Sequence, residues 1–130
     1  MPDHFHAVVW IDHKQARIMY FGVDEADKVV VHPERSARDV HRGERGSGHR
    51  LAEDKRYFRA VADAVADVGG LVIVGPSGEA HAFAKYLAET RPAISAHVEG
   101  VEKLDQRSDG ELLDYARRYV KAADRMRPQT

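Results

Sequence analysis

Short apolar runs alternate with polar turns in the first quarter of the chain, which is typical of consecutive β-strands. The runs "HAVVWID" and "QARIMYFG" are rich in β-branched and aromatic residues and flank a polar turn, so they predict a hairpin. The run "KVVVHPE" follows the acidic turn "VDEAD" and predicts a third strand. Pro33 ends that strand because proline cannot donate to a sheet ladder. A three-stranded meander is expected.

The pattern changes to a helical period from Glu53 onward. Four apolar residues share one helix face before Gly69 and Gly70 end the element: Phe58, Val61, Ala62 and Val65. The next run, "LVIVG", has no polar residue and predicts a strand buried on both faces, as in a parallel arrangement between helices. Ser77 is expected to cap a second helix, which ends before Pro92.

The last third of the chain predicts one more strand and one more helix. The strand is placed at "ISAHV", and the residues from Ser108 to Glu111 have the spacing of a capping box. The order is then β-β-β-α-β-α-β-α. Right-handed crossovers give a five-stranded mixed sheet in the order 3-2-1-4-5, with strand 2 antiparallel and helices on both faces. That is the three-layer α/β arrangement of ribonuclease-H-like folds, which hosts enzymes and binding modules alike.

Composition narrows the class of protein further. A chain of 130 residues fits one domain over 1–130, with a flexible basic loop at about 34–52 and a short tail at about 125–130. The net charge of -1 means that attraction to nucleic acid must come from a local patch. The absence of cysteine excludes disulfides and thiolate metal sites. With no signal peptide or long apolar run, we expect a cytoplasmic protein without a membrane partner.

The order of elements carries a resemblance to a known family. The chain from "FHAVVWIDHKQARIMYFG" through a long basic glycine-containing loop to "RYFRAVADAVADVGGLVIVGPSGEAHAFAKYL" resembles the middle domain of archaeal and eukaryotic peptide-chain release factors and of Pelota. It is also similar to small bacterial proteins grouped as translational machinery or release-factor-related proteins. Six residues occupy places that match the family pattern: Asp12, Ala16, Tyr57, Phe58, Gly75 and Pro76.

The resemblance gives the long loop a specific meaning. In release factors this loop carries Gly-Gly-Gln, whose glutamine helps to place the attacking water. The matching segment here reads Gly46, Ser47, Gly48 and His49, so the glutamine is absent. Pelota-type domains also lack the motif, so a role on the ribosome without peptidyl-tRNA hydrolysis is implied. Release factors read stop codons with a separate domain for which this chain has no room, so decoding is not expected.

Arginines are concentrated in the same loop. Five of them, against the two acids Asp39 and Glu44, give a local charge of about +3: Arg35, Arg38, Arg42, Arg45 and Arg50. Arginine forks suit phosphates, and glycines let a loop adapt to RNA. We therefore expect the segment to bind the backbone of ribosomal RNA or tRNA. Arg42, Arg45 and Arg50 would meet phosphates, Gly46 and Gly48 would supply the loop conformation, and His49 would occupy the tip. An ordinary solvent-exposed loop is the alternative.

Other readings of the sequence stay open. A hydrolase could use His49 for residual peptidyl-tRNA hydrolysis, or Asp12 as a metal ligand of a ribonuclease, although no other carboxylate is spaced to join Asp12. Asp12 could equally cap a hairpin turn. His4 and His6 have the spacing of a metal pair but no evident third ligand. The third class of function is a protein-interaction module, which would form a homo-oligomer through the exposed edge strand "KVVVHPE". No cofactor is expected.

Overall fold

The computed structural model describes residues 6–22, 25–33 and 47–126, without the side chains of 47–54 and 123–126. The first part of the chain forms three consecutive strands: β1 (His6–Ile11), β2 (Ala16–Phe21) and β3 (Ala26–Val31). The second part alternates helices with strands: α2 (Ser47–Ala64), β4 (Gly70–Gly75), α3 (Glu79–Thr90), α4 (Pro92–Ser95), β5 (Val98–Lys103) and α5 (Asp109–Met126).

The sheet has the order β3-β2-β1-β4-β5, which confirms the predicted topology. β2 pairs antiparallel with both β1 and β3, whereas β4 pairs parallel with β1 and β5 pairs parallel with β4. The chain leaves β1 toward β2 on one side and returns to β4 on the other. The carboxyl ends of β1 and β4 therefore form the point at which strand order reverses, where open α/β sheets commonly bind ligands.

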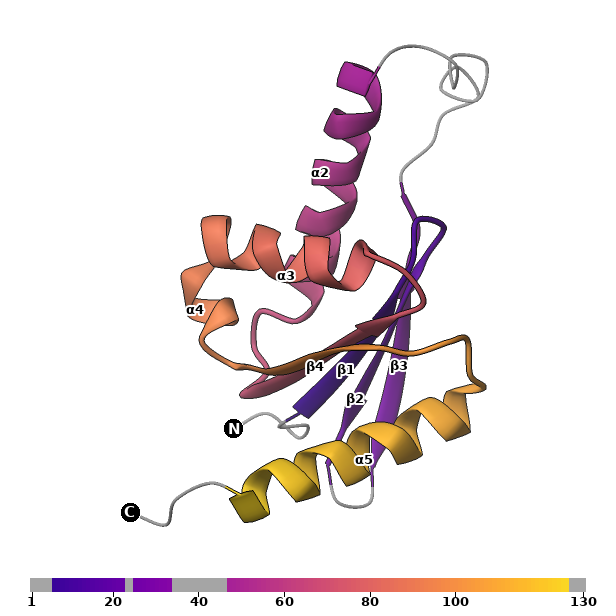
Figure 1. Ribbon diagram of the computed structural model, residues 1–130, viewed down its shortest axis with the longest axis vertical. Coiled ribbons are helices and arrows are strands. Elements are labelled where there is room, and N and C mark those ends of the chain that lie inside the picture. The colour runs from indigo at the N-terminus through magenta and orange to yellow at the C-terminus, as the bar shows by residue number, and fades with distance from the viewer. Residues whose placement is uncertain (1–5, 23–24, 34–46, 127–130) are drawn as a thin grey trace.

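Helices cover the two faces of this sheet. In Figure 1, α2, α3 and α4 lie on one face and α5 lies on the other. The apolar residues of β1 alternate between the layers: Val9 and Ile11 face α2 and α3, and Val8 and Trp10 face α5. All six residues of β4 are buried, as expected for a central strand covered on both faces.

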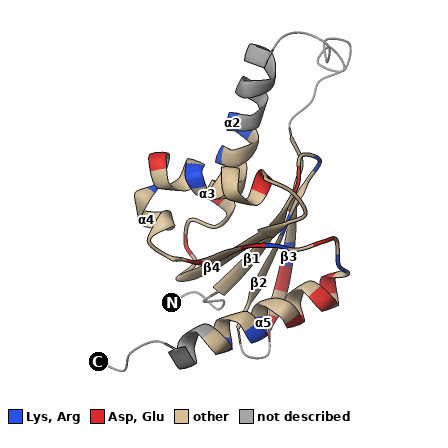
Figure 2. Ribbon diagram, viewed as in Figure 1, with Lys and Arg blue, Asp and Glu red and all other residues tan. Residues whose placement is uncertain are grey.

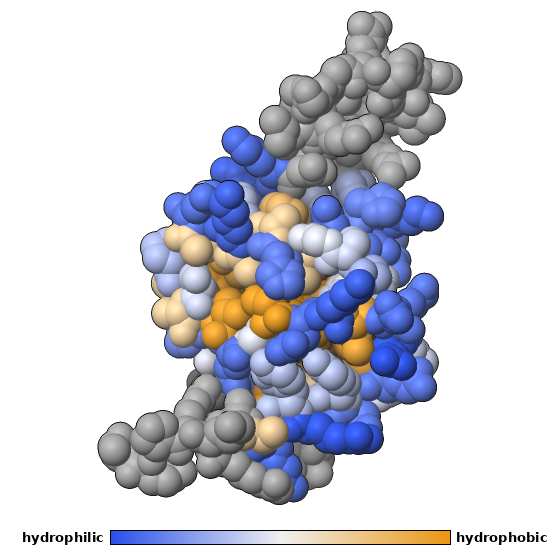
Figure 3. Space-filling view, viewed as in Figure 1, coloured by the Kyte–Doolittle hydropathy of each residue, from blue (hydrophilic) through white to orange (hydrophobic). Residues whose placement is uncertain are grey.

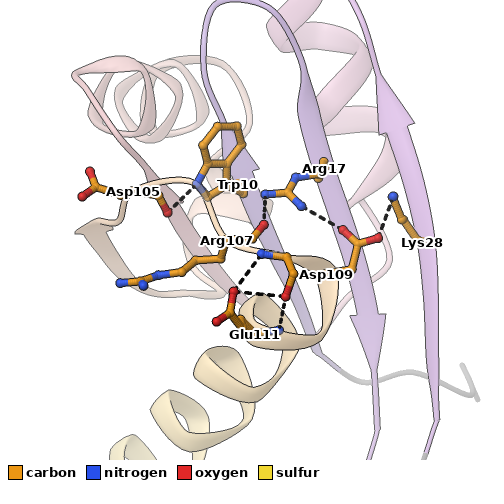
Figure 4. Close-up of polar contacts among 8 residues, drawn as sticks. Trp10, Arg17, Lys28, Asp105, Arg107, Asp109 and Glu111 are labelled. Carbon is orange, nitrogen blue, oxygen red and sulfur yellow. Dashed lines mark hydrogen bonds and ion pairs between the residues drawn. The ribbon is translucent and has the colours of Figure 1, made fainter.

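A buried arginine fixes the start of α5 to the sheet. Arg17 of β2 is only 7% exposed, and its guanidinium donates to Asp109 Oδ1 at 2.8 Å and to the Arg107 carbonyl oxygen at 2.7 Å (Figure 4). It also lies 4.9 Å from the centre of the Trp10 ring, within cation–π range. Lys28 of β3 holds the other Asp109 oxygen at 2.7 Å. β2 and β3 thus both hold the first turn of α5.

The capping box that was predicted for α5 is confirmed. Ser108 Oγ accepts a hydrogen bond from the Glu111 backbone N–H at 3.2 Å, and Glu111 Oε1 accepts one from the Ser108 backbone N–H at 3.1 Å. The hydrogen bonds that the Ser108 backbone N–H and then the Ser108 hydroxyl donate to the Glu111 carboxylate hold its pKa below the usual range. Leu112, Ala116 and Val120 form the inward face of α5, because residues four positions apart share one side of a helix.

Two element boundaries differ from the predicted ones. β3 begins at Ala26, inside the expected acidic turn, because its backbone pairs with β2 as far as Ala26 opposite Phe21. It ends at Val31, before Pro33, as expected. The helix expected from Glu53 begins at Ser47, so residues 47–52 are helical and not part of a loop. The segment reads "SGHRLA", and arginine, leucine and alanine are good helix formers that extend the element despite the glycine.

Two further predictions were wrong. Gly78, not Ser77, occupies the N-cap of α3, and no side-chain hydrogen bond caps that helix. The strand placed at "ISAHV" is not formed. Ile94 belongs instead to α4, which has Pro92 in its first turn, a position where the missing proline N–H costs little. The strand follows as β5. Its sequence, "VEGVEK", lacks a continuous apolar run because β5 is an edge strand with exposed Glu102 and Lys103.

Hydrophilic and apolar residues are distributed on the surface according to these layers. In Figure 3, hydrophilic residues cover much of the exposed surface of α2 and α3, and an apolar band crosses the middle of the view between those helices and α5. Val98 and Val101 of β5 are half-buried apolar residues that pack against the core on the α2 and α3 side. No helix within the described ranges is long and apolar enough to cross a membrane.

Candidate nucleic-acid interface

The carboxyl edge of the sheet is built around a tight turn at Asp12. The Asp12 Oδ1 atom accepts hydrogen bonds from the backbone N–H groups of Lys14 at 2.8 Å and Gln15 at 2.9 Å. This is the turn-capping role that aspartate commonly takes. No group of three or more His, Cys, Asp or Glu residues that could hold a metal occurs among the described residues. The geometry therefore assigns Asp12 a structural part in the turn.

The start of α3 approaches this turn closely. Gly75 ends β4, and a Cβ atom added to it would lie 2.3 Å from the Ile11 carbonyl oxygen, a separation that no side chain tolerates. Glycine at this position therefore lets β4 leave the sheet beside the end of β1. The following residues, from Pro76 to Gly78, form the connection into α3. The segment "GPSGEA" thus acts as a strand-to-helix turn.

Tyr57 connects α2 to the same turn. Its hydroxyl donates a hydrogen bond to the Asp12 carbonyl oxygen at 2.8 Å. Burial, and then the charges of Asp12 and Glu79, raise the pKa of Tyr57 far above its ordinary value, so the phenol stays protonated and remains a donor. Phe58 beside it packs edge-on against Phe83 of α3 with ring centres 5.5 Å apart. The middle of α2 is thus fixed to both the sheet edge and α3.

The outer face of α2 is basic. Lys55, Arg56 and Arg59 are exposed, and none of them forms an ion pair with a described residue. Arg59 follows Lys55 by four positions and Arg56 by three, so it neighbours both on the helix surface. Figure 2 shows Lys and Arg residues, drawn in blue, on the described part of α2. One turn further on, Asp63 is paired with Arg91 at 2.6 Å, which neutralises the nearest described acid on that face.

Lys14 and His32 extend this basic region to the sheet edge. Both side chains are exposed, and Lys14 makes no ion pair with a described residue. Lys14 belongs to the turn between β1 and β2, and His32 follows β3 directly. Together with the outer face of α2, they flank the two ends of the basic segment 34–46. We call the set Lys14, His32, Lys55, Arg56 and Arg59 the basic edge.

Most of the site residues predicted from the sequence lie outside the residues or side chains that the structure describes. Arg35, Arg38, Arg42, Arg45 and Gly46 lie outside the described residues. Gly48, His49 and Arg50 lie in the first turns of α2, where their side chains are not described. The expectation that Gly48 supplies a loop conformation was therefore wrong, because its backbone is helical. His49, the candidate catalytic residue at the loop tip, is likewise part of a helix.

The predicted histidine pair is only partly described. His4 lies outside the described residues. The His6 ring stacks on Phe21 with centres 5.7 Å apart, and His6 Nε2 lies 3.2 Å from Glu99 Oε2 on β5. These contacts fix His6 at the amino edge of the sheet, opposite to the basic edge. His81 and His97 are both exposed.

Known structures share the fold of this chain. No protein-family model and no curated protein matches the sequence significantly. The solved structure of Pelota from Archaeoglobus fulgidus matches with a TM-score of 0.64 at 14% identity, over 92% of this chain and 33% of that one. Pelota from Thermoplasma acidophilum matches with a TM-score of 0.60 at 18% identity, over 86% and 31%. An archaeal translation termination factor, aRF1, matches with a TM-score of 0.59 at 11% identity, over 93% and 38%.

These matches establish the fold and confirm the resemblance. The chain has the mixed α/β fold found in the Pelota and aRF1 structures, and it spans about a third of the length of each of them.

Sequence reasoning missed the basic edge. The five arginines of the loop lie within sixteen consecutive residues, whereas Lys14, Lys55, Arg56 and Arg59 are distributed over a turn and a helix. The signal was nevertheless present. Once Phe58, Val61, Ala62 and Val65 are assigned to the buried face of a helix, the helical period places Arg56 and Arg59 on the exposed one.

Proposed function

We propose that this chain is a translation-associated RNA-binding domain of the cytoplasm that contacts the backbone of ribosomal RNA or tRNA and does not decode stop codons. The observation that carries the proposal is the outer face of α2, where Lys55, Arg56 and Arg59 are exposed without a described ionic partner. The aRF1 neighbour is a translation termination factor, which supports a role in translation.

Two groups of cations would act together. The arginine-rich segment supplies Arg42 and Arg45, and α2 continues that charge with Arg50, Lys55, Arg56 and Arg59. Lysine and arginine bind phosphates through charge, which gives affinity without reading base sequence. Because the net charge is only -1, this local concentration of cations is what would direct the molecule to RNA.

Salt-dependent gel shifts with labelled tRNA, together with co-sedimentation with ribosomes, test the proposal. Two variants each remove three charges: Arg42, Arg45 and Arg50 to alanine, and Lys55, Arg56 and Arg59 to alanine. We expect both to weaken binding by at least about tenfold, as loss of several phosphate contacts should. The matched control replaces Lys103, Arg107 and Lys121, which are exposed on β5, the following loop and α5. Equal binding by all three variants would refute the proposal.

A specific observation also favours a second function, that of a homo-oligomeric interaction module. β3 is an open edge of the sheet, and its Val29 and Val30 are 41% and 37% exposed, the large apolar side chains with the highest exposure among the described residues. Pairing of two β3 strands would cover both valines. Light scattering on the wild-type chain and on Val29→Lys decides this. A dimer that the substitution dissociates supports it, and a monomeric wild-type chain excludes it.

A further inference from the structure

A hollow of about 440 Å³ lies beside the basic edge, where the turn between β1 and β2 meets the end of β3. It is lined by Lys14, Gln15, His32 and Pro33. The sheet register explains why these residues meet. Ala16 pairs with Val31, so continuing the antiparallel ladder by two positions brings Gln15 beside His32 and Lys14 beside Pro33. The hollow is thus formed by ordered residues at the junction of two strands.

The hollow combines three kinds of chemistry. Lys14 offers an ammonium group, and the nearby Asp12 carboxylate is already held by the backbone N–H groups of Lys14 and Gln15. His32 and Pro33 offer an exposed imidazole and a half-buried apolar ring, which suit the flat face of a base. Gln15, half-buried between them, has both a donor and an acceptor. The volume falls in the range of roughly 300–1,000 Å³ typical of small-ligand sites.

We propose that this hollow holds one nucleotide of the bound RNA. Lys14 meets a phosphate, the base lies against His32 or Pro33, and Gln15 hydrogen-bonds to the base edge or the ribose. The inference rests on the proposed function and adds to it a defined site that contacts a base as well as the backbone. The position fits, because the hollow lies at the sheet edge directly before the arginine-rich segment.

Nuclear magnetic resonance on the full chain provides the test, since the His32 ring gives its own signals. We expect an unstructured RNA hexamer and 5′-AMP to move the His32 ring signals and to leave those of His97 unchanged. His97 is also an exposed histidine, and it precedes β5 at the opposite, amino edge of the sheet. Inorganic phosphate alone should produce a smaller change, because it cannot contact the ring faces.

Alanine substitutions in the hollow should also lower the affinity for the hexamer. Lys14→Ala should weaken binding on the order of fivefold, as expected for one charged contact. His32→Ala should weaken it by at least about fivefold, as expected for one stacked base. Lys121→Ala, an exposed lysine of α5, should bind like the wild type. All three side chains are exposed, so the variants should keep the fold.

The outcomes separate this inference from the proposed function. The hexamer could bind without moving the His32 signals more than those of His97, and with the same affinity for Lys14→Ala, His32→Ala and Lys121→Ala. In that case the nucleotide site is refuted and RNA binding stands. If no RNA binds to the wild-type chain, both fall. If phosphate reproduces the whole effect of 5′-AMP, the hollow is an anion site without base contact, and the proposal is overturned. If 5′-AMP moves the His32 signals and RNA does not, the hollow takes free nucleotides, and the RNA part is overturned.

Discussion

Tyr57 and Asp12 are joined by a hydrogen bond in which the phenol of one donates to the backbone carbonyl oxygen of the other at 2.8 Å. Tyr57 lies in the middle of α2, and Asp12 opens the turn after β1. The bond therefore sets the position of the basic face of α2 relative to Lys14 in that turn. A hydroxyl that is 45 residues away in sequence thus aligns two parts of the proposed interface.

Replacing Tyr57 with phenylalanine should destabilise the fold by about 1 kcal/mol, because it removes this hydrogen bond and leaves a carbonyl oxygen without its donor. Urea unfolding followed by circular dichroism measures the change. Tyr86→Phe is the matched control, since the Tyr86 ring packs against Phe58 and Phe83 and makes no described hydroxyl hydrogen bond. The control should stay within about 0.5 kcal/mol of wild type. An equal effect of both substitutions would contradict the structural role assigned to the Tyr57 hydroxyl.

Gly75 and Gly78 provide a second matched pair. A Cβ atom on Gly75 would lie 2.3 Å from the Ile11 carbonyl oxygen, whereas nothing lies within 4 Å of the same atom on Gly78. Gly75→Ala should therefore force β4 away from β1 and cost about 1–3 kcal/mol. Gly78→Ala should change stability by no more than about 0.5 kcal/mol. Thermal unfolding compares the two variants, and a Gly75→Ala protein as stable as Gly78→Ala would show that the close approach is not required.

Stability should fall in acid through Asp109. The hydrogen bonds from Lys28 and then Arg17 hold the pKa of the Asp109 carboxyl below its ordinary value, although partial burial opposes them. A carboxyl with a lowered folded-state pKa contributes stability above its unfolded pKa, near about 4, and loses it as the pH falls through the folded value. Wild type should therefore be more stable than Asp109→Asn at pH 7, and the difference should shrink as the pH falls through the lowered folded-state pKa.

Urea unfolding across this pH range tests the prediction. Asp105→Asn is the control, because the exposed Asp105 carboxylate forms no described ion pair. Its stability should run parallel to that of the wild type at every pH. A constant difference between wild type and Asp109→Asn would show that the charge of Asp109 contributes nothing.

RNA affinity should depend steeply on salt, and the outer face of α2 should account for a defined part of that dependence. For single-stranded RNA, each phosphate contact contributes about 0.7 to the slope of log affinity against log salt. Replacing Lys55, Arg56 and Arg59 with alanine should then lower the slope by roughly 2. Fluorescence anisotropy from low to moderate salt measures it. An unchanged slope with weakened affinity would mean that the substitutions act through the fold and not through phosphates.

Much of the fold could be predicted from the sequence because its buried elements have clear patterns. β1, β2 and β4 are rich in apolar and β-branched residues, and the capping-box spacing of Ser108 and Glu111 indicates where α5 begins. The failures fall where the environment overrides local pattern. β5 alternates acids with valines around a glycine because it is an edge strand. Ile94 reads as part of a strand, although Pro92 initiates a short helix that buries it.

The candidate site was predicted less completely. A run of arginines is visible in any sequence, but a surface formed by Lys14, His32 and one face of α2 depends on three-dimensional pairing. Ala16 has to pair with Val31, and Tyr57 has to contact Asp12, before these cations can be assigned to one edge. Such long-range contacts follow from topology, which local charge counting does not include.

The first part of α2 extends well beyond the point at which the helix is fixed to the sheet. Ser47 comes ten residues before Tyr57, the point at which the helix is fixed to the sheet edge. At 1.5 Å per residue, the start of the helix lies about 15 Å along its axis from that point. In Figure 1 this part of α2 extends past the edge of the sheet. Under the proposed function, the start of α2 would therefore contact RNA at some distance from the body of the molecule.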